Sequence, residues 1–320
     1  MIAGQGYCLY GPGSIDLCLV LPMYSFPIDY VEPVFRPPSE ARSLILPVTN
    51  GCSWNQCTFC EMYTQPQKKF RARKDDDIRQ DIERAASAIG DVRRVFLADG
   101  DAMVLPTRRL LGILGELRQA FPGLQRVSSY CLPRNLARKS VEELAELREA
   151  GLGILYVGME SGDDEVLRRV NKGESYESTR SALEKIRQAG LTSSVMVLNG
   201  LGGMILSRQH AVNTARLCNE TQPDYLSTLV VSFPQGEARF RAGFGDDFEP
   251  LTQPGLFEEI RLFLEHLELE KTVFRSDHAS NYLVLKGVLG RDKTRLLQEV
   301  NLALTSPGAV PLRPEWMRGL

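Results

Sequence analysis

Three cysteines stand within nine residues of this 320-residue chain, and no other segment concentrates reactive side chains as densely. Cys52, Cys57 and Cys60 have the spacing C-x4-C-x2-C and follow the mostly apolar, extended run 44–48. Loops that leave the carboxyl end of a strand are where α/β folds place their chemistry. Because three thiolates on one such loop can converge on a metal, the first hypothesis is a metal site.

The spacing favours an iron–sulfur cluster over zinc. Such clusters are usually held by four cysteine thiolates, so three would leave one iron of a four-iron cluster without a protein ligand. Structural zinc takes four ligands and usually pairs C-x2-C with a second, distant pair. The sequence has no second C-x2-C, and its histidines, at 210, 266 and 278, are remote from the cysteines. Zinc, or buried cysteines without a metal, remain open as alternatives.

With these cysteines the sequence resembles the radical S-adenosylmethionine (SAM) superfamily over roughly residues 42–235. In that family three cysteines, most often spaced C-x3-C-x2-C, hold a [4Fe–4S] cluster whose fourth iron binds the amine and carboxylate of SAM. An aromatic residue commonly precedes the third cysteine, as Phe59 does here. One extra residue between Cys52 and Cys57 departs from the usual spacing, so no subfamily is assigned. The resemblance implies a [4Fe–4S] cluster and SAM as cofactors.

The elements around the cysteines must place them at one edge of a sheet. With 43% hydrophobic residues the chain can bury one sizeable core, and strand-like runs alternate with helical patterns in six units from residue 44 onward. This alternation predicts a parallel sheet with right-handed crossovers. Six units match the partial (β/α)6 TIM-like barrel of the family, with a doubly wound α/β sheet as the alternative. We expect an N-terminal extension (1–41), the barrel (42–235) and a substrate-side extension with a helical tail (236–320).

Polar or glycine-rich residues follow nearly every predicted strand, on the edge that should carry the cysteine loop. Asp99-Gly100-Asp101 stands where the family carries a Gly-Gly-Glu-like motif that binds the SAM amino group, although Asp-Gly is also a common turn pair. Asn199 and Gly200 end the fifth strand, in a region that runs beside the adenine in the family. These residues are predicted cofactor contacts.

The fourth predicted strand ends in Glu160-Ser161, in a stretch that resembles coproporphyrinogen-dehydrogenase-like members of the family. In those members a polar residue here contacts SAM, and a basic residue twelve positions later pairs with the SAM carboxylate. Glu160 and Lys172 occupy those positions in this chain. A lysine lacks the bidentate geometry of arginine, so Arg168 and Arg169 are alternatives for the basic residue.

Four further residues lie near the same predicted edge or in the tail. Ser129 ends the third strand and can offer a hydroxyl to ribose or substrate, whereas Cys131 is more readily explained as a small buried hydrophobe. In the polar stretch 274–282, His278 is a candidate general acid or base and Tyr282 a candidate substrate contact. An ordinary hydrogen-bonded corner explains that stretch equally well.

Composition limits the cellular setting and the partners. A formal net charge of −2 does not indicate a nucleic-acid binder driven by bulk charge, although the basic run 68–74 is either a solvated face or a contact for an anionic substrate. No signal-peptide pattern and no apolar run of membrane-spanning length occurs. Seven cysteines, an odd number, suit a reducing compartment rather than a disulfide framework, so we expect a cytoplasmic protein.

The resemblance implies reductive cleavage of SAM to a 5′-deoxyadenosyl radical that abstracts hydrogen from a substrate. We expect a small-molecule substrate and a one-electron donor such as flavodoxin or ferredoxin. One alternative is a tRNA- or cofactor-modifying radical SAM enzyme that holds an anion with residues 68–74, and another is a non-catalytic zinc or iron–sulfur protein. The absence of a second cysteine group argues against methylthiotransferases.

Overall fold

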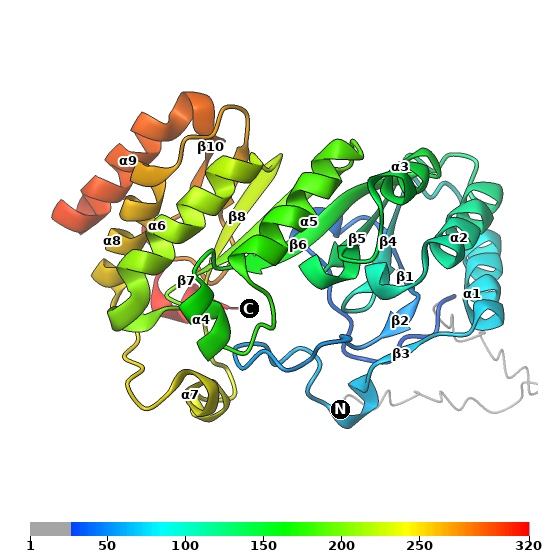
Figure 1. The fold of residues 1–320 in the computed structure, drawn as a ribbon, viewed down its shortest axis with the longest axis horizontal. Coiled ribbons are helices and arrows are strands. Elements are labelled where there is room, and N and C mark those ends of the chain that lie inside the picture. Colours follow the sequence, from blue (N-terminus) through cyan, green and yellow to red (C-terminus); the bar gives the residue numbers. More distant parts are fainter. Residues whose placement is uncertain (1–26, 320) are drawn as a thin grey trace, which may run out of the picture.

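A computed structural model describes residues 27–319 of the chain. Its central element is a curved sheet with helices along its outer side (Figure 1). Most of the predicted N-terminal extension (1–41) lies outside the described residues, as do Cys8 and Cys18.

Within the described range, eight strands form the main sheet in the order β1-β4-β5-β6-β7-β8-β9-β10. Neighbouring strands are parallel except for β9 and β10, and the edge strands β1 and β10 do not pair with each other, so the barrel is open. Each of the first six parallel strands lies beside its predecessor in the chain, without the reversal of order that a doubly wound sheet requires. The predicted partial barrel is confirmed. The strands are β1 (Leu44–Pro47), β4 (Arg94–Ala98), β5 (Arg126–Cys131), β6 (Leu152–Glu160), β7 (Thr192–Asn199), β8 (Tyr225–Val230), β9 (Val273–Ser276) and β10 (Leu285–Val288).

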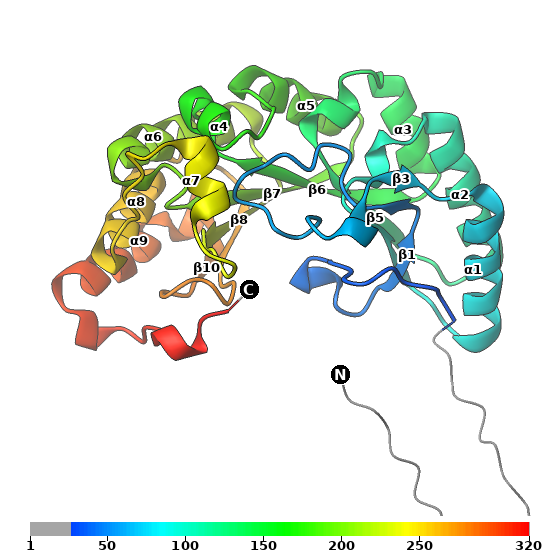
Figure 2. The same cartoon turned by 90° about the horizontal axis from the view of Figure 1, so that it is seen from below.

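Helices follow one another around the convex side of this sheet (Figure 2). In α2 the buried side chains Leu110, Ile113, Leu114 and Leu117 recur at the spacing of one helical face, which is the face that packs on the sheet. The helices are α1 (Asp75–Ala88), α2 (Thr107–Ala120), α3 (Val141–Glu149), α4 (Asp164–Arg169), α5 (Tyr176–Gln188), α6 (Gly203–Thr221), α7 (Ala238–Phe244), α8 (Gln253–His266) and α9 (Leu289–Thr305).

Both faces of the central strands are buried. In β4, Val95 and Leu97 join the core beneath the helices, whereas Phe96 and Ala98 join a smaller cluster with Tyr156 on the opposite, inner face. Side chains alternate between faces along a strand, so a strand buried on both sides has apolar residues at successive positions. This explains why β4 has four apolar residues in succession, Val95 to Ala98.

The C-terminal region contains strands as well as the predicted helices. Strand β9 pairs with β8 in parallel, and β10 pairs with β9 in antiparallel, so residues beyond 235 continue the sheet of the barrel. Each strand has only four residues and carries polar side chains such as Arg275 and Lys286, which hid the pattern in the sequence. The proposed domain boundaries stay a prediction.

The amino end of the barrel interior is closed by the segment that precedes β1. Glu40, fully buried, accepts hydrogen bonds from the Tyr156 hydroxyl (2.7 Å) and the Arg126 guanidinium (2.8 Å).

Across residues 27–319 the structure has no helix long and apolar enough to cross a membrane. The cytoplasmic location stays a prediction.

Candidate metal and cofactor site

The three cysteines lie on a long loop between two short strands, β2 (Thr49–Asn50) and β3 (Arg71–Ala72), which pair with each other just beyond the end of β1. Figure 2 shows this loop reaching across the barrel toward α7. The Thr58 N–H donates to the Val170 carbonyl (2.9 Å), and the Trp54 indole N–H donates to the Asn171 carbonyl (2.8 Å). The cysteine loop is thus tied to the segment that follows α4.

Helix α7 packs directly on the cysteine loop. The Arg239 guanidinium donates to the carbonyl of Cys60 (2.6 Å), and a methyl group added at Gly243 would lie 2.5 Å from the side chain of Thr58. Only a residue without a side chain permits this approach. Helix α7 therefore covers the loop from the side of the C-terminal extension.

The three thiols lie near one another in a shielded setting. Burial raises the pKa of Cys52 to about 11 and that of Cys60 to about 12, and it also raises the pKa of Cys57. Cys57 further raises the pKa of both other thiols, because a second negative charge close by disfavours ionisation. A bound metal must supply the positive charge that keeps these thiolates ionised at neutral pH.

The described thiols are not arranged around a single metal ion. Zinc–sulfur bonds of about 2.3 Å require ligand sulfurs within about 4 Å of one another. Among the residues that the structure describes, no three or more His, Cys, Asp or Glu side chains are placed to hold one metal ion. A four-iron cluster bridges thiols that are further apart.

The loop after β4 holds the cysteine loop in place through hydrogen bonds. The Asp101 carboxylate accepts hydrogen bonds from the N–H (3.0 Å) and hydroxyl of Ser53, and the Asp99 carboxylate accepts from the Gly51 N–H (3.2 Å). A methyl group at Gly100 would lie 2.8 Å from the Cα of Cys52, so only glycine fits there. The predicted contact of this motif with SAM stays a prediction, but the structure gives both acids a second task in holding Cys52.

A buried ion pair faces Cys57 at the end of β6. The Lys172 ammonium lies 3.1 Å from a carboxylate oxygen of Glu160 and 5.7 Å from the centre of the Phe59 ring. Burial lowers the pKa of Lys172, but Glu160 and the thiolate of Cys57 raise it more, so the amine stays charged. The structure thus brings together three residues that the sequence placed far apart.

The backbone of β6 is shaped to aim Glu160 inward. The register of β6 on β7 shifts between Gly158 and Glu160, and Glu160 has a left-handed φ of 63°. A side chain at Gly158 would collide with the Glu160 carboxylate. Bulges and sparsely populated backbone angles of this kind cluster at functional sites.

A buried network that the sequence did not reveal supports the ends of β6 and β7. His210 of α6 shares a hydrogen bond with the Ser161 hydroxyl (2.8 Å). Glu259 of α8 accepts from the Gly200 N–H and from the Ser207 hydroxyl, both at 2.6 Å. Asn199, next to Gly200, is buried. No local pattern links α8 to the glycine loop, because the contact depends on tertiary packing.

Two residues that were predicted to contact the cofactor are hydrogen-bonded to other protein groups instead. The Ser129 hydroxyl is fully buried, with the carbonyls of Leu97 (3.2 Å) and Tyr130 (2.9 Å) as alternative acceptors for its one proton. Arg168 lies on an exposed face of α4 with Glu165 (2.7 Å), whereas Lys172 lies close enough to Cys57 to lower the pKa of that thiol. Their roles stay predictions without support from these contacts.

His278 and Tyr282 lie in the loop between β9 and β10, at the carboxyl edge of the sheet, where C-terminal residues cover them. His278 shares a hydrogen bond with the Ser280 hydroxyl (2.9 Å), and Arg313 donates to the His278 carbonyl (2.7 Å). The Tyr282 hydroxyl donates to Glu315 (2.6 Å). These contacts describe a hydrogen-bonded corner, and the catalytic roles stay predictions.

The basic run 68–74 is partly structural. Lys68 is 1% exposed and pairs with Asp99 (2.6 Å), and Arg73 pairs with the buried Asp81. These two cations are committed to holding the cysteine loop and α1. Only the remaining, exposed part of the run is free to meet an anion.

Unpaired buried polar atoms gather around the cysteine loop. Nine such side-chain atoms occur in the described part of the chain, and four of them belong to Thr58, Glu61, Tyr63 and Asp99. Buried polar groups are nearly always hydrogen-bonded, so a concentration of unpaired ones marks a place built for a ligand. With the shielded thiols and the close approach at Gly100, this local environment fits a cluster and its bound cofactor.

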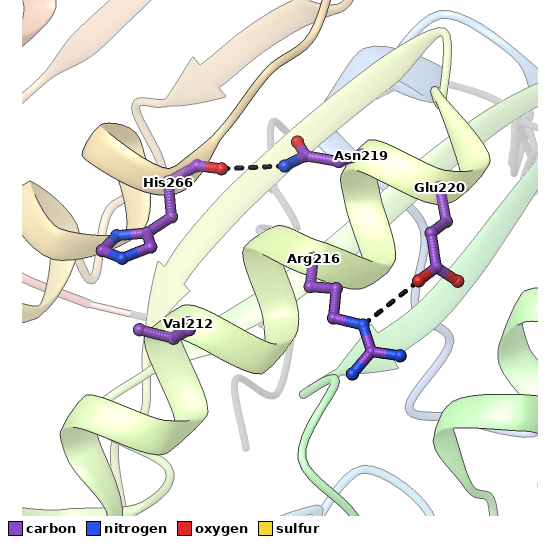
Figure 3. A pocket seen from close by; sticks show the side chains of 5 residues that line it. All are labelled: Val212, Arg216, Asn219, Glu220 and His266. Atoms are coloured by element: carbon purple, nitrogen blue, oxygen red, sulfur yellow. Dashed lines mark hydrogen bonds and ion pairs between the residues drawn. The ribbon is translucent and has the colours of Figure 1, made fainter.

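A groove in the outer helix layer has no part in this site. It has a volume of about 350 Å³ and is lined by Val212, Arg216, Asn219, Glu220 and His266 (Figure 3). Arg216 pairs with Glu220 (3.1 Å), and Asn219 donates to the carbonyl of His266 (2.8 Å). Its polar groups satisfy one another, and none of the predicted site residues lines it.

Comparison with known proteins agrees with this site. The family model of the radical SAM superfamily matches residues 46–218, more than half of the chain. The chain therefore belongs to the radical SAM superfamily, whose members bind a [4Fe–4S] cluster and SAM.

Individual relatives are distant. The chain is 21% identical to the heme chaperone HemW of Bacillus subtilis over 166 residues, which cover 50% of this chain and 43% of HemW. It is 23% identical to a putative methylthiotransferase of Methanocaldococcus jannaschii over 253 residues, which cover 70% of this chain and 52% of that protein. The chain thus spans about half the length of these relatives.

A solved structure supports the fold. Coproporphyrinogen III oxidase HemN from Escherichia coli, described as a radical SAM enzyme, superposes with a TM-score of 0.52 at 18% identity, covering 70% of this chain and 52% of HemN. At this identity the likeness concerns the fold. It agrees with the predicted resemblance to the coproporphyrinogen-dehydrogenase-like core and leaves the subfamily open.

Proposed function

We propose that the protein cleaves SAM reductively with a [4Fe–4S] cluster held by Cys52, Cys57 and Cys60 and uses the product radical on a small-molecule substrate. The observation that carries the proposal is the braced cysteine loop, which presents three shielded thiols beside a buried lysine–glutamate pair at the carboxyl edge of an open barrel. When bound, the cluster supplies the electron that splits SAM into methionine and a 5′-deoxyadenosyl radical, which takes a hydrogen atom from the substrate.

The chain's own residues would bind SAM and orient it. Lys172 offsets negative charge near Cys57 and would meet the SAM carboxylate, whereas Asp99 would meet the amine. Phe59 and α7 would exclude water from the thiols, which strengthens every electrostatic contact inside. Gly200, fixed by Glu259, would let backbone approach the nucleoside.

Substrate and electron donor follow as parts of the proposal. A small molecule would reach the barrel interior through the open side between β1 and β10. A one-electron donor such as flavodoxin or ferredoxin would reduce the cluster. RNA as substrate has less support, because Lys68 and Arg73 of the basic run are bound to carboxylates.

The test is anaerobic reconstitution followed by incubation with SAM and dithionite, with 5′-deoxyadenosine measured. We expect its formation in the wild type, its loss together with the cluster in Cys60→Ala, and its retention in Cys131→Ala, since Cys131 is a buried thiol on β5 rather than on the cysteine loop. A fully loaded cluster without any 5′-deoxyadenosine would refute the proposal. A colourless protein that retains only zinc would support the non-catalytic alternative instead.

A further inference from the structure

The side chain of Tyr63, three residues after the last cysteine, is buried without a hydrogen-bond partner for its hydroxyl. Tyr63 is 5% exposed, and within residues 27–319 no group bonds the phenol oxygen. Buried tyrosine hydroxyls usually find a partner, because an unpaired one loses its hydration and gains nothing in return. The hydroxyl therefore needs a partner that the protein itself does not provide.

Tyr63 is held in this position. Its carbonyl accepts a hydrogen bond from the side chain of Asn55 (2.8 Å), and its ring packs edge-on against Phe35 with centroids 5.7 Å apart. The ring cannot swing toward another protein group without losing these contacts. The unpaired hydroxyl is thus built into the folded loop.

A second unpaired buried atom lies in the same neighbourhood. Asp99 is 2% exposed; its Oδ2 is bonded by Lys68 (2.6 Å) and by the Gly51 N–H (3.2 Å), whereas its Oδ1 has no partner. Asp99 bonds the N–H of Gly51, next to Cys52, and Tyr63 follows Cys60 on the same loop. Burial raises the pKa of Tyr63, and Asp99 and Cys60 act in the same direction. A buried donor and a buried acceptor therefore stand unpaired beside the cysteines.

The unpaired phenol and carboxylate oxygens determine which hydrogen-bonding groups a ligand must carry here. The phenol donates and the Asp99 carboxylate accepts, so the ligand must carry an acceptor and a donor within a few bonds. Lys68 offsets the charge of Asp99. An α-amino acid group, with one ammonium and one carboxylate, has this pattern of donor and acceptor.

We propose that the Tyr63 hydroxyl donates a hydrogen bond to the carboxylate of the amino-acid end of SAM, while the free oxygen of Asp99 accepts from the ammonium. The inference rests on the proposed function, since it names a further contact in the same site. Tyr63 is a binding residue in this scheme and takes no part in electron transfer.

Tyr63→Phe is the test, and Tyr156→Phe is its matched control. The Tyr156 hydroxyl bonds Glu40 (2.7 Å) and Ser39 (2.8 Å), so its removal should lower the urea midpoint of the metal-free protein. Removal of the unpaired Tyr63 hydroxyl should leave that midpoint unchanged or raise it. Destabilisation by Tyr63→Phe as large as that by Tyr156→Phe would show that the hydroxyl already has a protein partner, and would overturn the inference.

The affinity of the cluster-loaded protein for SAM is the second measurement. By equilibrium dialysis, Tyr63→Phe should weaken SAM on the order of tenfold, as expected for a hydrogen bond to a charged group, and Tyr156→Phe should not. Methylthioadenosine, which lacks the amino-acid end, should bind the wild type and Tyr63→Phe equally.

Each contrary result has a distinct meaning. Unchanged SAM affinity in Tyr63→Phe would overturn the contact, and a shifted cluster reduction potential with unchanged affinity would assign the phenol to the cluster instead. Equal weakening of SAM and methylthioadenosine would move the contact away from the amino-acid end. A wild type that binds SAM but forms no 5′-deoxyadenosine would overturn the proposed function while leaving the contact intact, whereas a loaded wild type that does not bind SAM would overturn both.

Discussion

Replacing Gly100 with alanine tests whether the loop after β4 positions the first cysteine. A methyl group there would lie 2.8 Å from the Cα and Cβ of Cys52 and from the carbonyl oxygen of Gly51, about 0.6 Å inside the 3.4 Å at which ordinary contact begins. The Gly100 N–H also donates to that carbonyl (3.1 Å). The two loops therefore cannot separate to admit the methyl group without weakening this bond.

The size and sign of the effect follow from these contacts. Forcing a methyl group against packed backbone costs about 1–3 kcal/mol, so Gly100→Ala should lower the free energy of unfolding by that amount. Gly115 lies exposed in α2 with nothing within 4 Å of an added methyl group. In a helix interior alanine is more favourable than glycine by about 1 kcal/mol, so Gly115→Ala should stabilise. The same substitution should therefore lower the free energy of unfolding at position 100 and raise it at position 115.

Urea unfolding of the metal-free protein measures the stability change, and iron and sulfide per chain after reconstitution measure cluster loading. We expect Gly100→Ala to unfold at lower urea and to load less iron, because Cys52 is displaced from the other two thiols. Gly115→Ala should load as the wild type does. A Gly100→Ala protein with wild-type stability and a full cluster would refute the close contact between these loops.

Three further outcomes are expected. Lys172→Met leaves the Glu160 carboxylate buried without its partner and should lower the free energy of unfolding in urea by about 3–5 kcal/mol. Adding Glu160→Gln should restore part of this loss, and stability changes that simply add in the double variant would contradict the pairing. Glu259→Ala should speed amide exchange at Gly200 at least tenfold in hydrogen-exchange mass spectrometry, whereas Glu259→Gln keeps an acceptor and should exchange slowly; equal rates in the two variants would show that the side chain does not protect this amide. Burial, followed by a neighbouring guanidinium, lowers the pKa of His278, so its ring protons should titrate below the ordinary value of 6.5 in an NMR experiment, and a midpoint at or above 6.5 would argue for a more open ring.

Local patterns were sufficient for the fold class and for locating the cysteine loop, whose role as metal ligand stays a prediction. Cysteine spacing is a property of nine consecutive residues, and the alternation of strand and helix patterns over six units specifies a parallel sheet whichever contacts follow. The capping box that starts α3 likewise joins two residues three positions apart, Ser140 and Glu143. Such features depend on neighbours in the chain, which is why they could be predicted.

The C-terminal region was harder to predict, because short polar strands leave no periodic signal. Strands β9 and β10 owe their existence to pairing with β8 and with each other rather than to their own residues. The predicted helical tail was therefore incomplete. His278 and Tyr282 are joined to Arg313 and Glu315 from a segment some thirty residues further along the chain, a partnership that only the folded structure creates.

The sequence by itself determined that three thiolates share one loop and that this loop follows the first strand of a partial barrel. Only the tertiary structure decided what surrounds them: the pairing of Lys68 with Asp99, the support of Gly200 by Glu259 and the unpaired hydroxyl of Tyr63. The physical reason is that spacing along the chain specifies which ligands can converge. Burial and unpaired polar atoms arise only when distant segments exclude water together.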